Sequence, residues 1–208
     1  MSDVAYPDIS LPAPENVEWG IKPNTQEGQT SPLNASVQTL GQPGTRFIQR
    51  FSYSTLEEGD STLFQQFLMM LNGKEHRALL PMFARPQPRG TIALTGVTVD
   101  GAVVFGATSV DLAGCGAGAT LQPGDFFAIN HQVVMVVGTA PVTADGAGAM
   151  AGVNFRPFVR PVAGWADGAA VVTDRPTARY MQETDESLWR TRSPVLTDFT
   201  FSFIEAFQ

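Results

Sequence analysis

Few residues in this sequence could perform chemistry, and the most suggestive are an aspartate and a histidine in one stretch. Residues 121–137 read LQPGDFFAINHQVVMVV, in which Asp125 follows a Pro-Gly pair and His131 separates two runs of strand-forming residues. A histidine that acts as a general base needs a hydrogen-bonded partner and a nucleophile within reach. Asp125 precedes the strand that ends before His131, so the two side chains should lie several residues apart. The pattern therefore predicts a turn at PGD and a β-hairpin that turns at Asn130-His131, because asparagine tolerates a positive φ.

The single cysteine and the other histidine give no stronger signal. Cys115 lies in AGCGAGAT, a loose match to a dinucleotide-binding loop, but that loop requires a following helix and TLQPGD follows here. No helix start or adjacent base would activate the thiol. TADGAG at 143–148 lacks the spaced acids of a calcium loop, and His76, directly after a predicted helix, is typical of a solvated side chain. Two histidines and one cysteine do not make the usual zinc site, so we expect no catalytic, cofactor-binding or metal-binding residues and no enzymatic activity.

One segment predicts a helix, which would support the surrounding strands. GDSTLFQQFLMMLNG at 59–73 begins with candidate N-caps at residues 60–62 and ends with Asn72-Gly73, which favours a left-handed stop. Between these signals, apolar residues recur on one face: Leu63, Phe64, Phe67, Leu68 and Leu71. We expect a helix over about 60–72 whose apolar face packs on a sheet.

The N-terminal quarter predicts an arm followed by strands. Residues 1–16 contain three prolines and predict an extended arm rather than an element of structure. VEWGI at 17–21 predicts a short strand with Trp19 and Ile21 on one face. Residues 31–41 and 45–55 predict two strands, with QPG turning the chain between them into a hairpin.

Composition divides the rest of the chain. Residues 92–172 are rich in Gly, Ala, Val and Thr and contain Asp-Gly and Pro-Gly turn signals, a pattern typical of a small all-β module. After Pro176 the sequence becomes polar and aromatic again, and the closing LTDFTFSFIEAF alternates phenylalanine with polar residues. We therefore expect one β domain, formed by 17–91 plus 173–208, with 92–172 inserted into it. The closing strand around 198–206 should pair within the first of these domains.

Charge and composition restrict the classes of partner. Only 16% of the 208 residues are charged and the net charge is −7, whereas roughly 25% are charged in an ordinary domain. So neutral a surface favours self-association, and the absence of a basic stripe argues against binding nucleic-acid phosphates. No apolar run reaches the roughly 18 residues of a membrane span, and the N-terminus lacks signal-peptide features. A lone cysteine cannot form an internal disulfide, so we expect synthesis in a reducing cytoplasm.

The order of segments resembles that of tail proteins from tailed bacteriophages. The stretches that carry the resemblance are NTQEGQTSPLNASVQTLGQPGTRFIQRFSY, FLMMLNGKEHRALLPMFARPQPRG, LQPGDFFAINHQVVMVV, TADGAGAMAGVNFRPFVRP, DGAAVVTDRPTARYM and FTFSFIEAF. The similarity covers about residues 17–208 and is to the distal-tail and tail-tip components of long-tailed phages. The 16-residue arm before it is longer than the family pattern.

The resemblance implies both a fold and a role. The fold is mainly β: a tube-like antiparallel β sandwich or barrel with one helix and an inserted small all-β domain. The role is a structural protein of the virion tail, made in the host bacterial cytoplasm, forming a homohexameric ring that joins the tail tube to the tip or baseplate. Its partners would be copies of itself, the tail tube and the tip or hub proteins, with no membrane insertion and no specific nucleic-acid binding.

Such a ring subunit needs neutral surfaces and exposed strand edges that neighbours can cover. The candidate interface residues are Trp19, Ile21, Phe158 and Trp165. Another tail adaptor is an alternative role, as is a carbohydrate-binding module for host attachment, which would require exposed aromatic side chains on one face. A virion-associated hydrolase would require paired carboxylates or a Cys-His pair, and the sequence has neither pattern.

Overall fold

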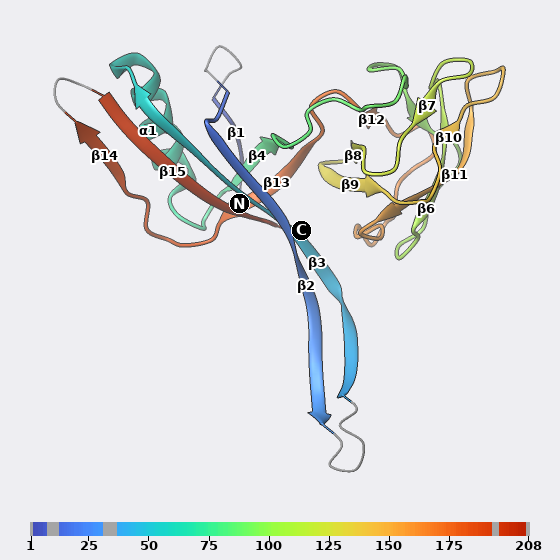
Figure 1. Cartoon of the computed structure of the whole chain (residues 1–208), viewed down its shortest axis with the longest axis horizontal. Helices are drawn as coiled ribbons and strands as arrows, with labels where there is room; N and C mark the ends of the chain where they lie inside the picture. Colours follow the sequence, from blue (N-terminus) through green and yellow to red (C-terminus); the bar gives the residue numbers. More distant parts are fainter. Residues whose placement is uncertain (1, 8–12, 31–36, 193–195, 207–208) are drawn as a thin grey trace.

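The computed structural model describes residues 2–7, 13–30, 37–192 and 196–206. The protein is mainly β with one helix, and Figure 1 shows two β-rich parts flanking a two-stranded ribbon that extends away from both. We call the part that contains the helix the helix-bearing domain and the other part the inserted domain, because the chain enters and leaves it between β4 and β13. This architecture agrees with the predicted fold class, a β sandwich or barrel with an inserted all-β domain.

The helix-bearing domain is built on a seven-stranded sheet. The strand order is β1-β4-β13-β15-β3-β2, and β14 pairs with β15 beside β13. These strands are β1 (Asp3–Ala5), β2 (Asn16–Thr30), β3 (Val37–Leu56), β4 (Arg77–Pro81), β13 (Thr177–Gln182), β14 (Trp189–Arg192) and β15 (Leu196–Glu205). The closing strand β15 pairs antiparallel with β3, β13 and β14, as predicted.

The helix α1 (Glu58–Leu71) packs its apolar stripe into this sheet. Phe64, Phe67, Leu68 and Leu71 are buried as predicted, and Asn72 ends the helix in the left-handed conformation with φ 47°. Leu63 is an exception, since 42% of it is exposed. At 3.6 residues per turn it lies roughly 90° from the centre of the stripe, beyond the face that the sheet covers.

The predicted N-cap is also wrong. Helix α1 begins about one turn earlier than the candidate caps at 60–62, and its cap residue Glu57 makes no side-chain capping bond. Instead Glu58 and Asp60 place negative charge in the first turn, which favours the positive end of the helix dipole. The side chain of Ser61, read as a cap from sequence, lies buried and donates a hydrogen bond to the Glu58 carbonyl.

The N-terminal residues are part of the sheet, which corrects the prediction of an arm outside any element. Strand β1 pairs in parallel with β4, with Val4 opposite Ala78. Val4 is buried and Tyr6 packs against the core of the helix-bearing domain. The alternating pattern of this segment covers only four residues. Its apolar side chains, Val4 and Tyr6, are buried by residues that lie far along the chain.

Strands β2 and β3 form one long hairpin, but the predicted turn at QPG is wrong. Residues 42–44 lie inside β3, where the register with β2 shifts between Lys22 and Asn24. Gly44 adopts a φ of 129° there, so the predicted turn is a bulge in a continuing strand. The turn signal is overridden because β2 continues to pair beyond it. Residues 31–36, the start of the predicted first strand, lie outside the described residues.

The inserted domain contains strands only, as its composition predicts. Its six-stranded sheet has the order β12-β8-β9-β11-β6-β5, and β7 pairs separately with β10. The strands are β5 (Thr98–Val99), β6 (Ser109–Ala113), β7 (Thr120–Leu121), β8 (Phe126–Ile129), β9 (Gln132–Val136), β10 (Val142–Thr143), β11 (Met150–Arg156) and β12 (Val171–Val172).

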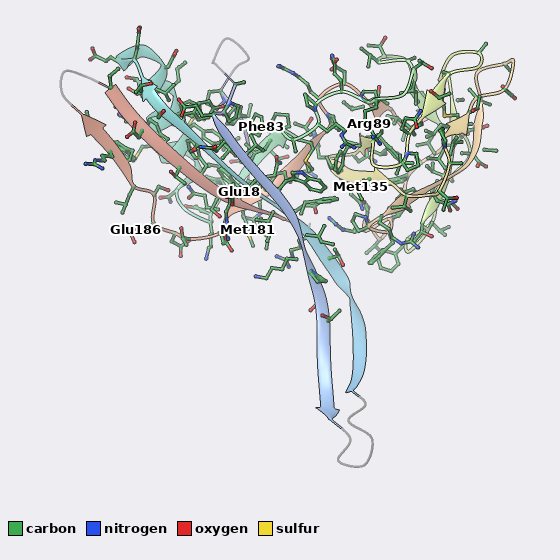
Figure 2. The ribbon with its side chains drawn as sticks, in the orientation of Figure 1. Glu18, Phe83, Arg89, Met135, Met181 and Glu186 are labelled. Carbon is green, nitrogen blue, oxygen red and sulfur yellow. The ribbon has the colours of Figure 1, made fainter. Side chains whose placement is uncertain are left out.

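The β8–β9 hairpin joins the two domains because both of its faces are buried. Phe126, Ala128 and Val133 belong to the core of the helix-bearing domain, while the alternate residues of the same strands belong to the core of the inserted domain. Met135 on β9 packs against the first of these cores, and Figure 2 shows it between the two domains. One hairpin therefore packs against both cores.

Candidate interaction surfaces

Asp125, the first candidate for chemistry, is a fully buried structural carboxylate. Its oxygens accept hydrogen bonds from the backbone N–H groups of Gln122 at 2.9 Å, Arg89 at 3.0 Å and Gly90 at 3.2 Å. Gln122 begins the PGD turn, and Gly124 has a φ of 88°, which makes the turn type II. Figure 2 shows Arg89 on the link that enters the inserted domain. Asp125 therefore fixes this link to the start of β8.

We expect Asp125→Asn to lower the free energy of unfolding by about 1–3 kcal/mol. The substitution keeps the shape of the side chain but points an amide NH2 group at backbone N–H donors that now bind a carboxylate. Urea unfolding monitored by tryptophan fluorescence would measure the change. The exposed Asp100 offers a matched control, since Asp100→Asn should alter stability by less than about 0.5 kcal/mol. Equal losses in the two variants would contradict the assigned role of Asp125.

The histidines and the cysteine lie apart from Asp125. Asn130 and His131 form the predicted turn between β8 and β9, with φ values of 50° and 60°, at the opposite end of β8 from Asp125. His76 lies beside Ser2, whose hydroxyl is 3.2 Å from Nδ1. Cys115 is buried in the inserted domain, and burial raises the pKa of its thiol to about 11.

The TADGAG stretch forms a turn, in which the Gly148 N–H donates to the Asp145 carbonyl. Asp145 accepts hydrogen bonds from the backbone N–H groups of Ala147 and Ala149, and these bonds lower the pKa of its carboxyl. Among the residues that the structure describes, no group of three or more His, Cys, Asp or Glu side chains could hold a metal ion. The polar groups singled out in the sequence thus organise turns and links.

The outer part of the β2–β3 hairpin extends away from both domains (Figure 1). Strand β15 pairs with β3 only between Ile48 and Leu56. Among the described residues, Val37–Phe47 of β3 pair with β2 alone, and the resulting ribbon extends beyond both domains in Figure 1. A two-stranded ribbon is marginally stable in water by itself, and both of its edges present unpaired backbone groups. The ribbon therefore has the form of an element that binds a neighbour.

The predicted interface residues lie in different environments. Trp19 and Ile21 share one face at the root of the ribbon and are 42% and 59% exposed, although the Trp19 ring also contacts Phe126 edge-on at 5.4 Å. Phe158 is half-buried. Trp165 is buried against Phe155 in the core of the inserted domain, so its assignment as an interface residue is wrong.

Other exposed apolar side chains were not identified from the sequence. On the inserted domain, Phe105 meets the Phe158 ring edge-on at 5.9 Å, beside the exposed Val104 and Val162. On the helix-bearing domain, the exposed residues are Met69, Met70, Leu188 and Trp189. The two methionines fall outside the buried stripe of α1. Their position relative to the stripe could have indicated from the sequence that they are exposed. Val104 and Phe105 gave none, because their segment reads as an ordinary buried strand.

A buried ion pair holds the inserted domain to the closing strand. An Arg160 nitrogen lies 2.5 Å from a Glu205 carboxylate oxygen, and the two side chains are 10% and 2% exposed. Arg160 also donates a hydrogen bond to the Thr45 carbonyl at 2.7 Å, while the Phe47 N–H donates to Glu205 at 3.0 Å. Burial raises the pKa of Glu205, and the Arg160 guanidinium opposes that rise. The pair thus links both domains to the root of the ribbon.

An apolar cavity of about 660 Å³ lies beside the N-terminal residues. Its walls come from β1 and the residues around Pro14, from β4 and the chain after it, and from Tyr53 and Arg175. Tyr6 lines it as well, and the hydroxyl groups of Tyr6 and Tyr53 are 2.6 Å apart. Burial raises the pKa of both tyrosines, so both hydroxyls remain protonated.

Comparison with known proteins does not identify a function for these surfaces. No model of a known protein family matches the chain, and no curated protein matches it. Within the described residues, no helix is long and apolar enough to cross a membrane. Assignment of a function therefore depends on the geometry of the surfaces and on the order of sequence motifs.

Proposed function

We propose that this protein is a structural subunit of a bacteriophage tail, a distal-tail-like ring component that joins the tail tube to the tip. The observation that carries the proposal is the β2–β3 ribbon, whose outer part pairs only with itself in the described chain. An element of this length, with two open edges, is explained by a neighbouring subunit that covers it. The ordered sequence resemblance to tail proteins supplies the biological context.

The distribution of apolar surface supports an assembled state. Exposed apolar side chains lie at the ribbon root, on the outer face of α1 and on the loops of the inserted domain. Three separated patches fit a subunit with neighbours on several sides, as in a ring that also stacks on other proteins. The low charged fraction, 16%, reduces the desolvation cost of covering these surfaces.

The environment of the polar residues supports a structural role over a catalytic one. Asp125 is saturated by backbone donors, and the Cys115 thiol is buried with a raised pKa. A glycan-binding module would need exposed aromatic side chains on one face, but Trp165, one of the candidate interface residues, lies in the core. These environments favour the ring subunit over the carbohydrate-binding alternative.

Shortening the ribbon should convert the assembled protein into a monomer. In the test variant Asn-Gly replaces residues 25–41, closing a hairpin on the paired residues Asn24 and Gln42 and retaining Thr45, which binds Arg160. Native mass spectrometry should detect a multiple of the 22.3 kDa chain for the wild type and the single chain for the variant. The melting temperatures of the two should agree within a few degrees, because the variant retains the β3 residues from Ile48 to Leu56 that pair with β15.

Two results would contradict the proposal. One is a wild-type protein that remains a single chain at all concentrations tested. The other is a shortened variant that assembles as fully as the wild type, which would show that the ribbon is not the element that neighbours bind.

A further inference from the structure

The N-terminal residues are bound to the helix-bearing domain in the manner of a docked peptide. Strand β1 adds in parallel to the edge of β4 along only three residues. The Arg179 Nε–H donates to both carboxylate oxygens of Asp3, at 2.8 and 3.0 Å. The Ser2 carbonyl accepts one from the Arg77 N–H at 3.1 Å. A short strand held by its backbone and by side-chain contacts at alternate positions is the pattern of β-strand addition.

The deepest contact of this segment is an aromatic pocket for Tyr6. The Tyr6 ring lies 5.3 to 6.0 Å from four phenylalanine rings, those of Phe51, Phe64, Phe67 and Phe83. Phe83, labelled in Figure 2, therefore lies at the end of β1. The Tyr6 hydroxyl bonds that of Tyr53 within the same pocket. The domain thus has a site for an apolar and an aromatic side chain at alternate positions, Val4 and Tyr6, while Arg179 binds the acidic Asp3.

A proline-rich stretch of sequence connects this segment to β2. Tyr6 is bonded to Tyr53 of β3, and the Glu15 N–H donates to the carbonyl of the adjacent Ser52 at 3.0 Å. The nine steps from Tyr6 to Glu15 include three prolines, and extended proline-rich chain spans about 3.1 Å per residue, or roughly 28 Å in all. The sequence of the link is therefore long enough to place the segment on a neighbouring molecule.

We propose that in the assembled ring this segment exchanges between subunits, so that residues 2–7 of one copy occupy the β4 edge and the Tyr6 pocket of the next copy. The inference rests on the proposed ring, since it needs a neighbour within reach of the link. Exchange of an identical element keeps every contact of the segment and adds a connection between subunits, so it costs little. Passed from each copy to the next, the exchange closes on itself in a ring.

Disulfide trapping can determine which chain donates the segment. Ala5 and Leu79 are register partners on β1 and β4, and neither side chain belongs to the core. Adjacent strands lie about 4.8 Å apart, a separation that a disulfide spans. Full-length Ala5→Cys and Leu79→Cys chains with different tags are co-expressed and oxidised. Native Cys115 stays in place because burial keeps its thiol out of exchange.

Exchange predicts covalent dimers that carry both tags. Their yield should exceed that of a control pair, Ala5→Cys with Thr62→Cys, by roughly a hundredfold, because a docked partner raises the effective concentration of the thiols to the millimolar range. Thr62 is exposed on α1 and is not a register partner of β1. A single chain that carries both Ala5→Cys and Leu79→Cys should form covalent ladders under the same conditions.

Mixed dimers no more abundant than the control, with the double-cysteine chain closing an internal disulfide or forming none, would overturn the exchange. Native mass spectrometry of the same samples separates this result from failure of the proposed function. If the protein assembles but forms no mixed dimers, the proposed ring stands and the exchange is contradicted. If the protein is a single chain in every sample, both proposals are contradicted.

Discussion

Phe67→Ala should lower the free energy of unfolding by about 3–5 kcal/mol. Phe67 is 2% exposed and its ring contacts Tyr6 at 5.6 Å and Phe203 at 6.4 Å. Truncation removes one of the contacts between α1 and β15 and also opens the Tyr6 pocket. Because a domain is held by only about 5–15 kcal/mol in total, much of the protein should become insoluble.

Gln66→Ala is the matched control, since Gln66 is exposed on the opposite side of α1. Its effect on stability should stay within about 0.5 kcal/mol. Thermal melting of the two purified variants beside the wild type measures both effects. A Phe67→Ala protein that melts at the wild-type temperature would show that the stripe contributes nothing within the subunit and would leave a partner interface as its explanation.

The features predicted well from sequence are those that depend on neighbouring residues. The apolar stripe of α1 repeats within three turns, and Asn72 stops the helix whatever lies around it. The turn at Asn130-His131 is local in the same sense. Leu63 was wrongly predicted to be buried because an apolar pattern indicates the centre of a buried stripe more reliably than its edge. The width of the stripe depends on how much of the helix surface the sheet covers.

The features that the sequence did not predict depend on residues far along the chain. The QPG stretch resembles a turn, but the continued pairing of β2 makes it a bulge. Val4 and Tyr6 look like part of a loose arm until β4 and the aromatic pocket are formed. Arg160 lies in the loop after β11 and Glu205 at the end of β15. No motif or spacing in the sequence indicates that they form an ion pair. Long-range contacts of this kind position the surfaces on which the proposed function depends.

Replacing Arg160 should destabilise the protein as strongly as truncating the helix core. Arg160→Met removes one partner of a buried ion pair and leaves the Glu205 carboxylate uncompensated, at a cost of about 3–5 kcal/mol. The exposed pair Arg50–Glu183, at 3.1 Å with side chains 52% and 31% exposed, is the control. Arg50→Met should cost less than about 1 kcal/mol, because solvent already screens that pair.

Two further measurements separate the loss of charge compensation from a simple loss of packing. The double variant Arg160→Met with Glu205→Gln should recover more than half of the lost stability, because glutamine is neutral and keeps an oxygen to accept the Phe47 N–H. The stability gap between Arg160→Met and the wild type should also depend on pH. Burial already raises the pKa of Glu205 above its unfolded value, and loss of Arg160 raises it further.

The sign of that pH dependence follows from the direction of the shift. A carboxyl whose folded pKa lies above its unfolded pKa binds a proton on folding, so the folded state gains stability as pH falls through the folded pKa. The gap should therefore be widest at pH 8 and should narrow towards pH 5, as Glu205 becomes neutral first in the variant. Urea unfolding of both proteins across this range provides the measurement. A gap that does not change with pH would mean that the buried carboxylate is not the source of the instability, and that Arg160 acts through its contact with Thr45 at the root of the ribbon.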